Sequence, residues 1–213
     1  HDTMKLPTYK TLLLATLISV QAMGQSAPDS IKAIIQKWVP DTRVAVANID
    51  IKYKKRTLFI VGETTEKNMI HDIENWAMNN KIKTNIQLNI LPDATISNTY
   101  GLIAVSVANL RKQARHSAEL VSQAVMGTPI RILKDSAGHY LLQTPDKYIG
   151  WVTKASVKSM SEIQNNEWKE ANRYIYTKVS GWLYDDTTCQ TPVSDVCLGS
   201  IFELVEQQQQ WLC

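Results

Sequence analysis

The feature of this sequence that most constrains its fold is a stretch of short apolar runs between positions 99 and 158, separated by turn formers. The runs, such as 103–107 and 130–133, hold only four or five residues and show little helical period. Turn-forming residues stand between them, as in DSAG at 135–138 and PDK at 145–147. Because turns that recur about every 8–12 residues are typical of small barrels, we predict five short strands here, closed into a β-barrel.

Part of this stretch returns later in the chain. The string VSQAVMG at 121–127 reappears as VSDVCLG at 193–199, 72 positions later. The second copy reaches Trp211, Leu212 and Cys213 where the first copy continues to residue 152. We therefore expect a second barrel over 173–213 that lacks about one hairpin and leaves an unpaired apolar edge. On the same reasoning we expect that Cys213 is not the natural end of the polypeptide.

Residues 28–92 show a different pattern, with the order helix, strand, strand, helix, strand. We expect the first helix to be capped by Asp29 or Ser30 and to stop before Pro40. A strand over 44–53, with a bulge near Asn48, and a strand over 57–62 should follow. A helix from residue 64 or 65 and a strand over 84–90 complete the unit. The basic turn at 52–56 is either a contact for anionic lipid or wall polymer or, as we favour, a solvated hairpin tip.

The N-terminus predicts export. Two lysines precede a run of about ten mostly apolar residues, and the small residues Ala22 and Gly24 follow, which is the layout of a signal peptide over 4–24. The run is too short for a membrane span, which needs about 20 residues. We therefore expect an exported protein of the periplasm or cell envelope. In that compartment Cys189 and Cys197 either form a local disulfide or, by default, remain free thiols.

A short helix should connect the two predicted barrels. Ser161 followed three residues later by Gln164 has the form of a capping box, which opens a polar helix to about Ala171. Gln207 to Gln210 should form a lengthened loop. The predicted organisation is thus a signal peptide (4–24), an α/β domain (28–92), a barrel (98–158), a linker helix (159–172) and a truncated second barrel (173–213), an α+β fold overall.

The sequence shows no recognisable catalytic chemistry. With 23 Lys and Arg against 20 Asp and Glu, the net charge of +3 is too small and dispersed to indicate nucleic acid as a partner. No cysteine stands in a pattern that would activate it beside a histidine, and we place His116 and His139 in barrel loops. No zinc or phosphate-binding motif is present. We expect a non-catalytic chain without a metal or cofactor.

Four strings in the middle of the chain resemble the bacterial SH3 domain: VANLR at 107–111, MGTPIRIL at 126–133, HYLLQTPD at 139–146 and YIGWV at 148–152. Residues 28–92 resemble the small BON-like α/β domains of exported bacterial proteins. The string VSVANLR…HSAELVSQAVMGTP adds to these features. With it, the chain resembles the N-terminal half of exported NlpC-type cell-wall peptidases. That resemblance implies a papain-like cysteine peptidase domain outside this chain, which cuts the γ-D-glutamyl–diamino acid bond of peptidoglycan stem peptides.

For the barrel we expect a ligand groove floored by aromatic side chains, because such a face suits sugar rings and peptide backbones. Its candidate residues are Tyr140, Tyr148, Trp151, His116, Glu119 and Asp135. Trp151 serves equally well to close the barrel core. The expected partner is a peptidoglycan stem peptide or glycan, and residues 112–119 are an alternative contact for the chain's own downstream peptidase domain. A stand-alone periplasmic adaptor that binds a protein partner is the second hypothesis.

Overall fold

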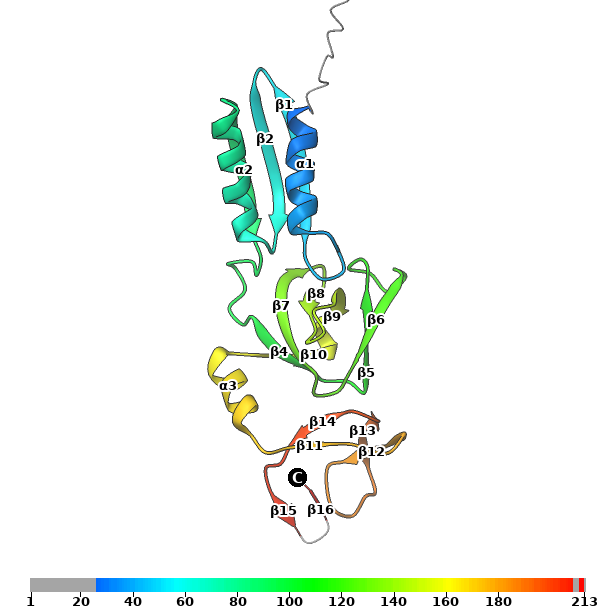
Figure 1. Ribbon diagram of the computed structural model, residues 1–213. Helices are drawn as coiled ribbons and strands as arrows, with labels where there is room; N and C mark the ends of the chain where they lie inside the picture. Colours follow the sequence, from blue (N-terminus) through cyan, green and yellow to red (C-terminus); the bar gives the residue numbers. More distant parts are fainter. Residues whose placement is uncertain (1–25, 209–210, 213) are drawn as a thin grey trace, which may run out of the picture.

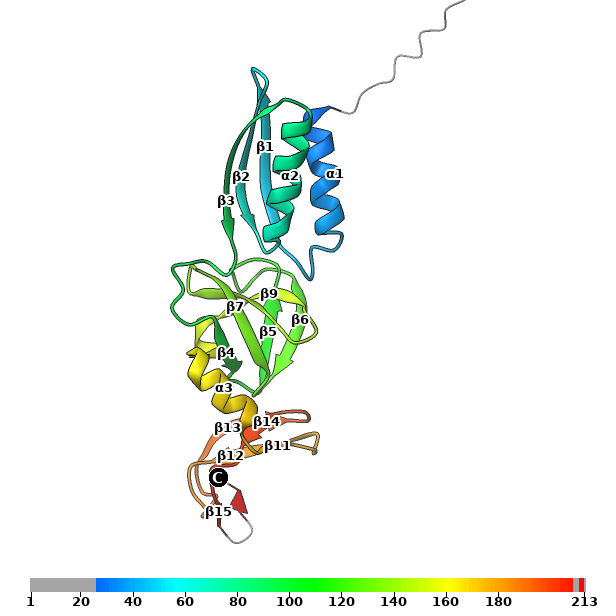
Figure 2. The same cartoon turned by 60° about the vertical axis from the view of Figure 1, so that its left-hand side comes forward.

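The computed structural model describes residues 26–208 and 211–212, which form three units that follow one another along the chain (Figures 1 and 2). A helical and β-stranded unit lies at one end, a curved β-sheet in the middle and a group of short strand pairs at the other end. Most of the regular structure is β-strand, with few helices. The predicted signal peptide, 4–24, lies outside the described residues. Within those residues, no helix has the length and apolar character needed to cross a membrane.

The first unit has the predicted order of elements. They are α1 (Ala27–Trp38), β1 (Ala47–Lys54), β2 (Thr57–Thr64), α2 (Lys67–Asn79) and β3 (Lys83–Ile90). β2 is the central strand, antiparallel to β1 and parallel to β3. α2 makes the crossover that a parallel neighbour requires. Both helices cover the same face of the sheet (Figure 2).

The core of this unit lies between that face and the helices. Leu58 and Ile60 are two residues apart on β2 and therefore point to the same side of the sheet. They meet Ile31 of α1 and the i, i+4 pair Met69 and Ile73 of α2, and all five side chains are fully buried. Burial of each such side chain stabilises the fold by about 1.5–3 kcal/mol, so these residues fix both helices on the sheet.

Three local predictions in this unit are wrong. The helix expected from residue 64 or 65 begins at Lys67, because β2 extends to Thr64. The cap of α1 is Ser26, whose Oγ accepts from the Asp29 N–H at 3.4 Å, and neither Asp29 nor Ser30 is the cap. No bulge occurs at Asn48, because β1 and β2 pair without a register shift. The strand irregularity falls on Gly62, opposite Ile49, with a φ of +148°. A Cβ at Gly62 would lie 2.0 Å from the Asn48 carbonyl oxygen, so only glycine allows the two strands to approach this closely.

The middle unit is an open sheet. Its strands are β4 (Tyr100–Ile103), β5 (Val107–Arg111), β6 (Leu120–Val125), β7 (Pro129–Ser136), β8 (His139–Gln143), β9 (Ile149–Thr153) and β10 (Val157–Met160), with the short helix η1 (Lys154–Ser156) before β10. They lie in the order β10-β4-β7-β8-β9-β5-β6, and all neighbours are antiparallel. The predicted strand over 103–107 is instead the end of β4, a turn and the start of β5.

The prediction of a closed five-stranded barrel is therefore wrong. The sheet has seven strands and curves strongly, but β6 and β10 remain its edges (Figure 1). The two edge strands, β6 and β10, do not pair with each other. The turn after β6 instead follows β4: the Ile103 N–H donates to the Thr128 carbonyl at 3.1 Å and the Gly127 N–H donates to the Ile103 carbonyl at 2.8 Å, next to the β4–β7 ladder. One further bond, from the Met126 N–H to the Ser106 carbonyl at 3.2 Å, joins this turn to the turn after β4.

The middle sheet has apolar clusters on both faces over β7, β8 and β9. Its concave face holds a core of aliphatic side chains that includes Leu110, Ile132 and Leu142. On the opposite face, Leu133 and Leu141 pack with Ile149 and with Leu91 from the segment after β3, and Val46 from the start of the first unit adds to this cluster. An apolar cluster therefore joins the first unit to the sheet.

The third unit begins with the predicted capping box. Ser161 Oγ accepts from the Gln164 N–H, the Gln164 side chain accepts from the Ser161 N–H, and α3 runs over Glu162–Glu170. β11 (Arg173–Ile175) pairs with β14 (Ile201–Glu203), and β12 (Ser180–Tyr184) pairs with β13 (Pro192–Cys197). β15 (Gln207–Gln208) pairs with β16 (Trp211–Leu212), so the predicted glutamine loop begins with a short strand. Cys189 and Cys197 are free thiols.

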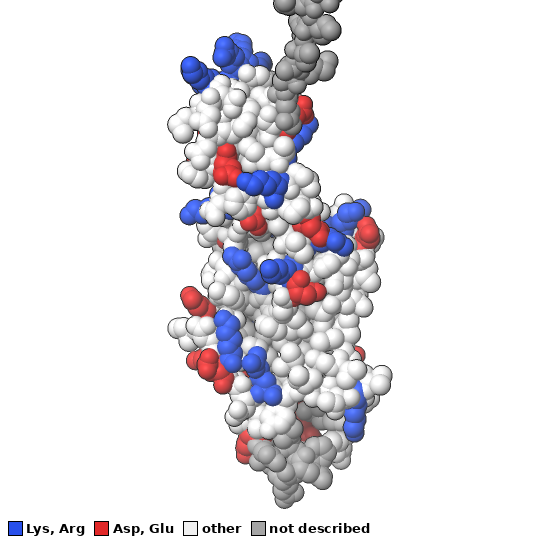
Figure 3. Space-filling model, viewed as in Figure 1, with Lys and Arg blue, Asp and Glu red and all other residues white. Residues whose placement is uncertain are grey.

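Positive and negative side chains mix over the surface seen in Figure 3, without one large field of a single sign. Blue side chains gather at the tip of the β1–β2 hairpin (Figure 3). Lys54, Lys55 and Arg56 are exposed there, in accord with a solvated tip.

Candidate ligand-binding sites

The structure distributes the six candidate residues over three sites. Glu119, Tyr148 and Trp151 line a groove between the first unit and the sheet, which we call the junction groove. His116 and Trp151 line a small second site, the two-histidine pocket. Asp135 and Tyr140 line a third site, the Tyr140 pocket. One reason for the separation is that Tyr140 and Leu141 are neighbours on β8 and therefore point to opposite faces of the sheet.

The junction groove is the largest of these sites, with a volume of about 650 Å³. One wall comes from residues 42–48 and Glu63, and the other comes from the end of β5 and the starts of β6 and β9. Backbone contacts hold the walls together. The Ile149 N–H donates to the Arg43 carbonyl at 2.7 Å, and the Gln143 amide donates to the Val44 carbonyl at 3.0 Å.

An ion pair also crosses this joint. Lys134 Nζ on β7 lies 2.5 Å from a Glu63 carboxylate oxygen at the end of β2, and the two side chains are only 31% and 16% exposed. Partial burial reduces solvent screening, so this pair holds the wall more firmly than a surface pair would.

The junction groove carries charges of both signs beside aromatic rings. The Glu119 carboxylate, 67% exposed, lies 3.3 Å from Lys112. On the other wall, the Arg43 guanidinium hydrogen-bonds to Asp41, and this bond lowers the pKa of the Asp41 carboxyl from 3.8 to about 2. The same carboxylate raises the pKa of Arg43, so both groups stay charged at neutral pH. A ligand with separate positive and negative groups and a flat backbone would meet complementary partners here.

The two-histidine pocket is much smaller, about 120 Å³. The His116 ring lies edge-on to the His139 ring, with 5.5 Å between the centroids. His139 is only 7% exposed, its Nδ1 lies 3.0 Å from the Ala137 carbonyl oxygen, and its Nε2 has no hydrogen-bond partner in the described part of the chain. The sequence prediction placed His139 in a loop, but it is the first residue of β8. The continuous apolar run Tyr140–Leu142 that follows it could have shown this.

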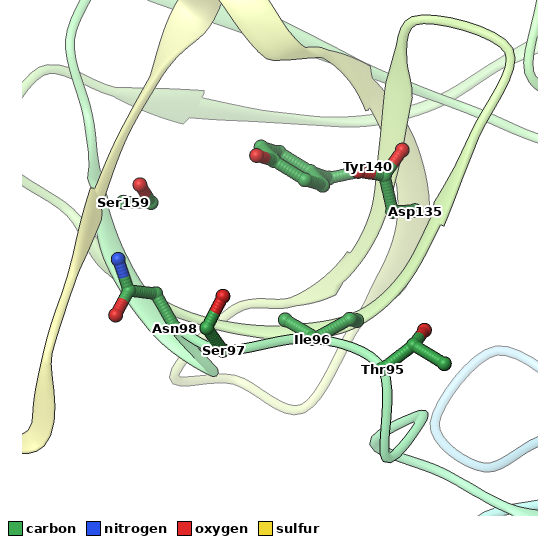
Figure 4. Close-up of a pocket in the computed structure, with 7 residues that line it drawn as sticks. All are labelled: Thr95, Ile96, Ser97, Asn98, Asp135, Tyr140 and Ser159. Atoms are coloured by element: carbon green, nitrogen blue, oxygen red, sulfur yellow. The ribbon is translucent and has the colours of Figure 1, made fainter.

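The Tyr140 pocket has a volume of about 350 Å³ and lies where the segment 95–98 passes the end of the curved sheet (Figure 4). Tyr140 projects into it from β8, Asp135 comes from β7 and Ser159 from β10. Lys154 Nζ lies 2.5 Å from the Asp135 carboxylate and 5.2 Å from the centre of the Tyr140 ring. Asn98 and Ser97 escaped the sequence prediction because they belong to a connecting segment without a motif.

The described residues contain no group of three His, Cys, Asp or Glu side chains placed to hold a metal ion. The Cys197 thiol lies 3.4 Å from the Ser106 carbonyl oxygen and 3.8 Å from Ser200 Oγ, so its neighbours are a carbonyl and a hydroxyl.

A comparison with protein families finds a match for the middle of the chain. A family described as the bacterial dipeptidyl-peptidase Sh3 domain matches residues 110–157. The prediction of a bacterial SH3 domain in this region is thus confirmed, although its sheet is open. The match includes β6 to β9 and all six candidate residues.

Among solved structures, the chain is similar to an NlpC/P60 endopeptidase from Photobacterium damselae subsp. piscicida, with a TM-score of 0.43 and 19% identity. The similarity covers 55% of this chain and 29% of that one, so this chain spans less than a third of that structure's length. Comparison with curated proteins finds no match.

Proposed function

We propose that this chain is the non-catalytic wall-binding and substrate-positioning module of an exported NlpC-type endopeptidase that cuts γ-D-glutamyl–diamino acid bonds. The cysteine peptidase domain would be a separate part of that protein. Support comes from the SH3 domain, whose family is named for dipeptidyl-peptidases, and from the sequence strings that resemble the N-terminal half of NlpC-type peptidases. The observation that carries the proposal is the junction groove, to which the SH3 domain and the first unit each contribute one wall.

The chemistry of the junction groove fits a stem peptide. Such a peptide carries amino and carboxylate groups along a short flat backbone. Glu119 is suited to an amino group, the cationic side chains of Arg43 and Arg111 to carboxylates, and the rings of Tyr148 and Trp151 to the backbone between them. The groove also exceeds the lower size limit of about 300 Å³ for small-ligand sites. The module would thus hold the stem peptide while the peptidase domain cuts it.

The domain organisation belongs to the same proposal. The third unit would be a second, incomplete SH3-like copy, and repeated hydrogen bonds support this. The Gly127 N–H donates to the Ile103 carbonyl, and the Gly199 N–H donates to the Tyr176 carbonyl. Both glycines have a left-handed φ, +78° and +89°. The pairing of β11 with β14 likewise repeats that of β4 with β7.

The first unit would be the BON-like domain, with its two helices on one face of a three-stranded sheet. A signal peptide at 4–24 would direct the chain to the periplasm or cell envelope. The domain limits would be those that the sequence predicts, 28–92, 98–158 and 173–213, with the linker helix between the last two.

Co-sedimentation with purified sacculi tests the wall-binding function. The chain should pellet with sacculi, and Glu119→Gln should weaken that retention roughly three- to tenfold, because the loss of one charge-assisted contact costs about 1 kcal/mol. Glu74→Gln is the matched control, since Glu74 is an exposed glutamate on α2, outside the residues that line the groove. Retention no better than that of an unrelated basic protein of similar size would contradict the proposal.

A protein-binding adaptor is the second candidate function, and the third unit supplies the observation that favours it. Ile175, Trp182 and Val193 are 60–62% exposed. An apolar pocket of about 300 Å³ lies nearby, between Tyr174 and Phe202. Exposed apolar groups of this kind mark protein contacts. Specific capture of a periplasmic protein, lost in Trp182→Ser, together with no retention on sacculi, would favour the adaptor.

A further inference from the structure

The Tyr140 pocket differs chemically from the junction groove. It is lined almost entirely by neutral polar groups around one aromatic ring: Thr95, Ser97, Asn98 and Ser159 surround Tyr140, and Ile96 adds an apolar surface. Figure 4 shows the Tyr140 ring projecting into the space, with Ile96, Ser97 and Asn98 across from it and Ser159 on the side of its hydroxyl. The segment after β3 and the strands of the sheet therefore form opposite walls.

The one carboxylate of the pocket is already neutralised. Asp135 pairs with Lys154 at 2.5 Å, and the same ammonium lies over the Tyr140 ring at 5.2 Å from its centre. This contact raises the pKa of Lys154, chiefly through the hydrogen bond to Asp135, so the ammonium remains charged. A charged ligand would have to displace this short ion pair, whose side chains are 40% and 43% exposed, whereas a neutral ligand would not. The Lys112–Glu119 pair of the junction groove is longer, 3.3 Å, and more exposed, 67% for both side chains, so Glu119 stays more accessible to a charged group.

Most neutral groups of the pocket are hydrogen-bond donors and acceptors that have no partner within the described chain. In the described chain, the side chains of Ser97, Asn98 and Ser159 and the Tyr140 hydroxyl make no hydrogen bond to another residue, in contrast to Thr95, which bonds to Asp93. An amide side chain offers both donors and acceptors, and hydroxyls offer one donor and two acceptor positions each. These groups converge on a space bordered by an aromatic ring.

We propose that the Tyr140 pocket is a carbohydrate subsite that holds one pyranose ring of a neutral amino-sugar glycan. A sugar presents an apolar face of C–H groups, which packs on an aromatic ring, and a rim of hydroxyl and amide groups. Tyr140 and Ile96 provide the apolar contacts, and Asn98 with the serine hydroxyls provides the rim partners. A volume of about 350 Å³ admits a single substituted ring but is near the lower limit for small-ligand sites.

This inference deepens the proposed function and rests on it only for the identity of the glycan. The junction groove, with its charged residues, would hold the peptide part of the wall polymer, and the Tyr140 pocket would hold its sugar part. Because the two sites use different side chains, they can be tested separately.

Titration of the protein with the N-acetylglucosamine trimer, followed by saturation-transfer and amide-shift NMR, tests whether the Tyr140 pocket binds a sugar ring. We expect a dissociation constant on the order of 1 mM, typical of one weakly held ring. Shifts should concentrate at residues 95–98, Tyr140 and Ser159. Tyr140→Leu should weaken binding roughly tenfold, and Asn98→Ala should weaken it about threefold to fivefold through the loss of one hydrogen-bonding side chain.

Two controls make the result decisive. Tyr53→Leu removes another tyrosine, 43% exposed on β1 and far from the pocket, and should leave trimer binding unchanged. Glu119→Gln should also bind the trimer normally while losing retention on sacculi, which separates failure of the groove from failure of the subsite. Tyr140 packs partly on the core, so Asn98→Ala provides the test if Tyr140→Leu unfolds. No shifts up to about 10 mM trimer, equal binding by Asn98→Ala, or pocket shifts with a stem peptide instead would overturn the proposal.

Discussion

Replacement of Gly127 by alanine should separate the third unit from the SH3 sheet. Gly127 lies in the turn after β6 with a φ of +78°, and a Cβ there would come within 2.0 Å of the Ile201 carbonyl oxygen. To reach the 3.0 Å that real Cβ contacts require, the Ile201 backbone must move by about 1 Å. That movement breaks the hydrogen bond from the Ile201 N–H to the Met126 carbonyl, 2.9 Å long, which joins the two units.

The magnitude follows from two contributions. Alanine in a left-handed conformation costs about 1–2 kcal/mol. Loss of the hydrogen bond and the displacement of Ile201 add about 1–2 kcal/mol. Gly127→Ala should therefore lower the free energy of unfolding by about 2–4 kcal/mol.

Two other glycines serve as controls that separate the conformational strain from the steric contact with Ile201. Gly138 has a φ of +75° and open space around its Cβ position, and Gly199 has a φ of +89° with one ordinary contact at 3.8 Å. Gly138→Ala and Gly199→Ala should cost only the conformational strain, about 1–2 kcal/mol. Urea unfolding measures the free energies of unfolding. Hydrogen exchange at the Ile201 amide shows whether its hydrogen bond to Met126, which joins the two units, is intact. Equal costs for Gly127→Ala and Gly138→Ala, with an unchanged Ile201 exchange rate, would refute this reasoning.

Other predictions concern single interactions. Lys134→Met should destabilise the protein by about 1–2 kcal/mol in urea unfolding, because its ion pair is half-buried, whereas Lys112→Met should cost less than about 0.5 kcal/mol. A carbon-detected NMR titration should give Asp41 a pKa of about 2, and Arg43→Gln should return it toward 3.8; the stabilisation from this depressed pKa is present above about pH 4 and lost as the pH falls toward 2. Ser161→Ala removes the capping box and should cost about 1 kcal/mol, with a smaller helical signal in circular dichroism.

Local sequence patterns predicted the elements well where the physical cause is itself local. The capping box at Ser161 depends on residues three positions apart, and the structure contains it. The order of helices and strands along the first unit follows from periodicity within each segment. Closure of the SH3 sheet depends instead on whether its two distant edge strands, β6 and β10, pair with each other, and no local pattern predicts that they do not.

The junction groove escaped prediction because it requires two units to dock. A signal for that docking was nevertheless present in the sequence. Ile132 and Leu133 are adjacent on β7, and Leu141 and Leu142 are adjacent on β8, and all four are buried. Adjacent strand residues point to opposite faces, so consecutive apolar pairs indicate a sheet covered on both sides. Which element provides the second cover, here Leu91 and Val46, remained beyond the reach of sequence patterns.

The two joints between the units differ in kind, and this has a consequence for the spacing of the two proposed binding sites. An apolar cluster and a half-buried ion pair connect the first unit to the SH3 sheet. Hydrogen bonds such as that from the Ser106 hydroxyl to Asp195, 2.6 Å long, connect the sheet to the third unit. Both the junction groove and the Tyr140 pocket include strands of the SH3 sheet, and the apolar joint holds the other wall of the groove on that sheet. A polymer that occupied both sites would therefore meet them at a fixed separation.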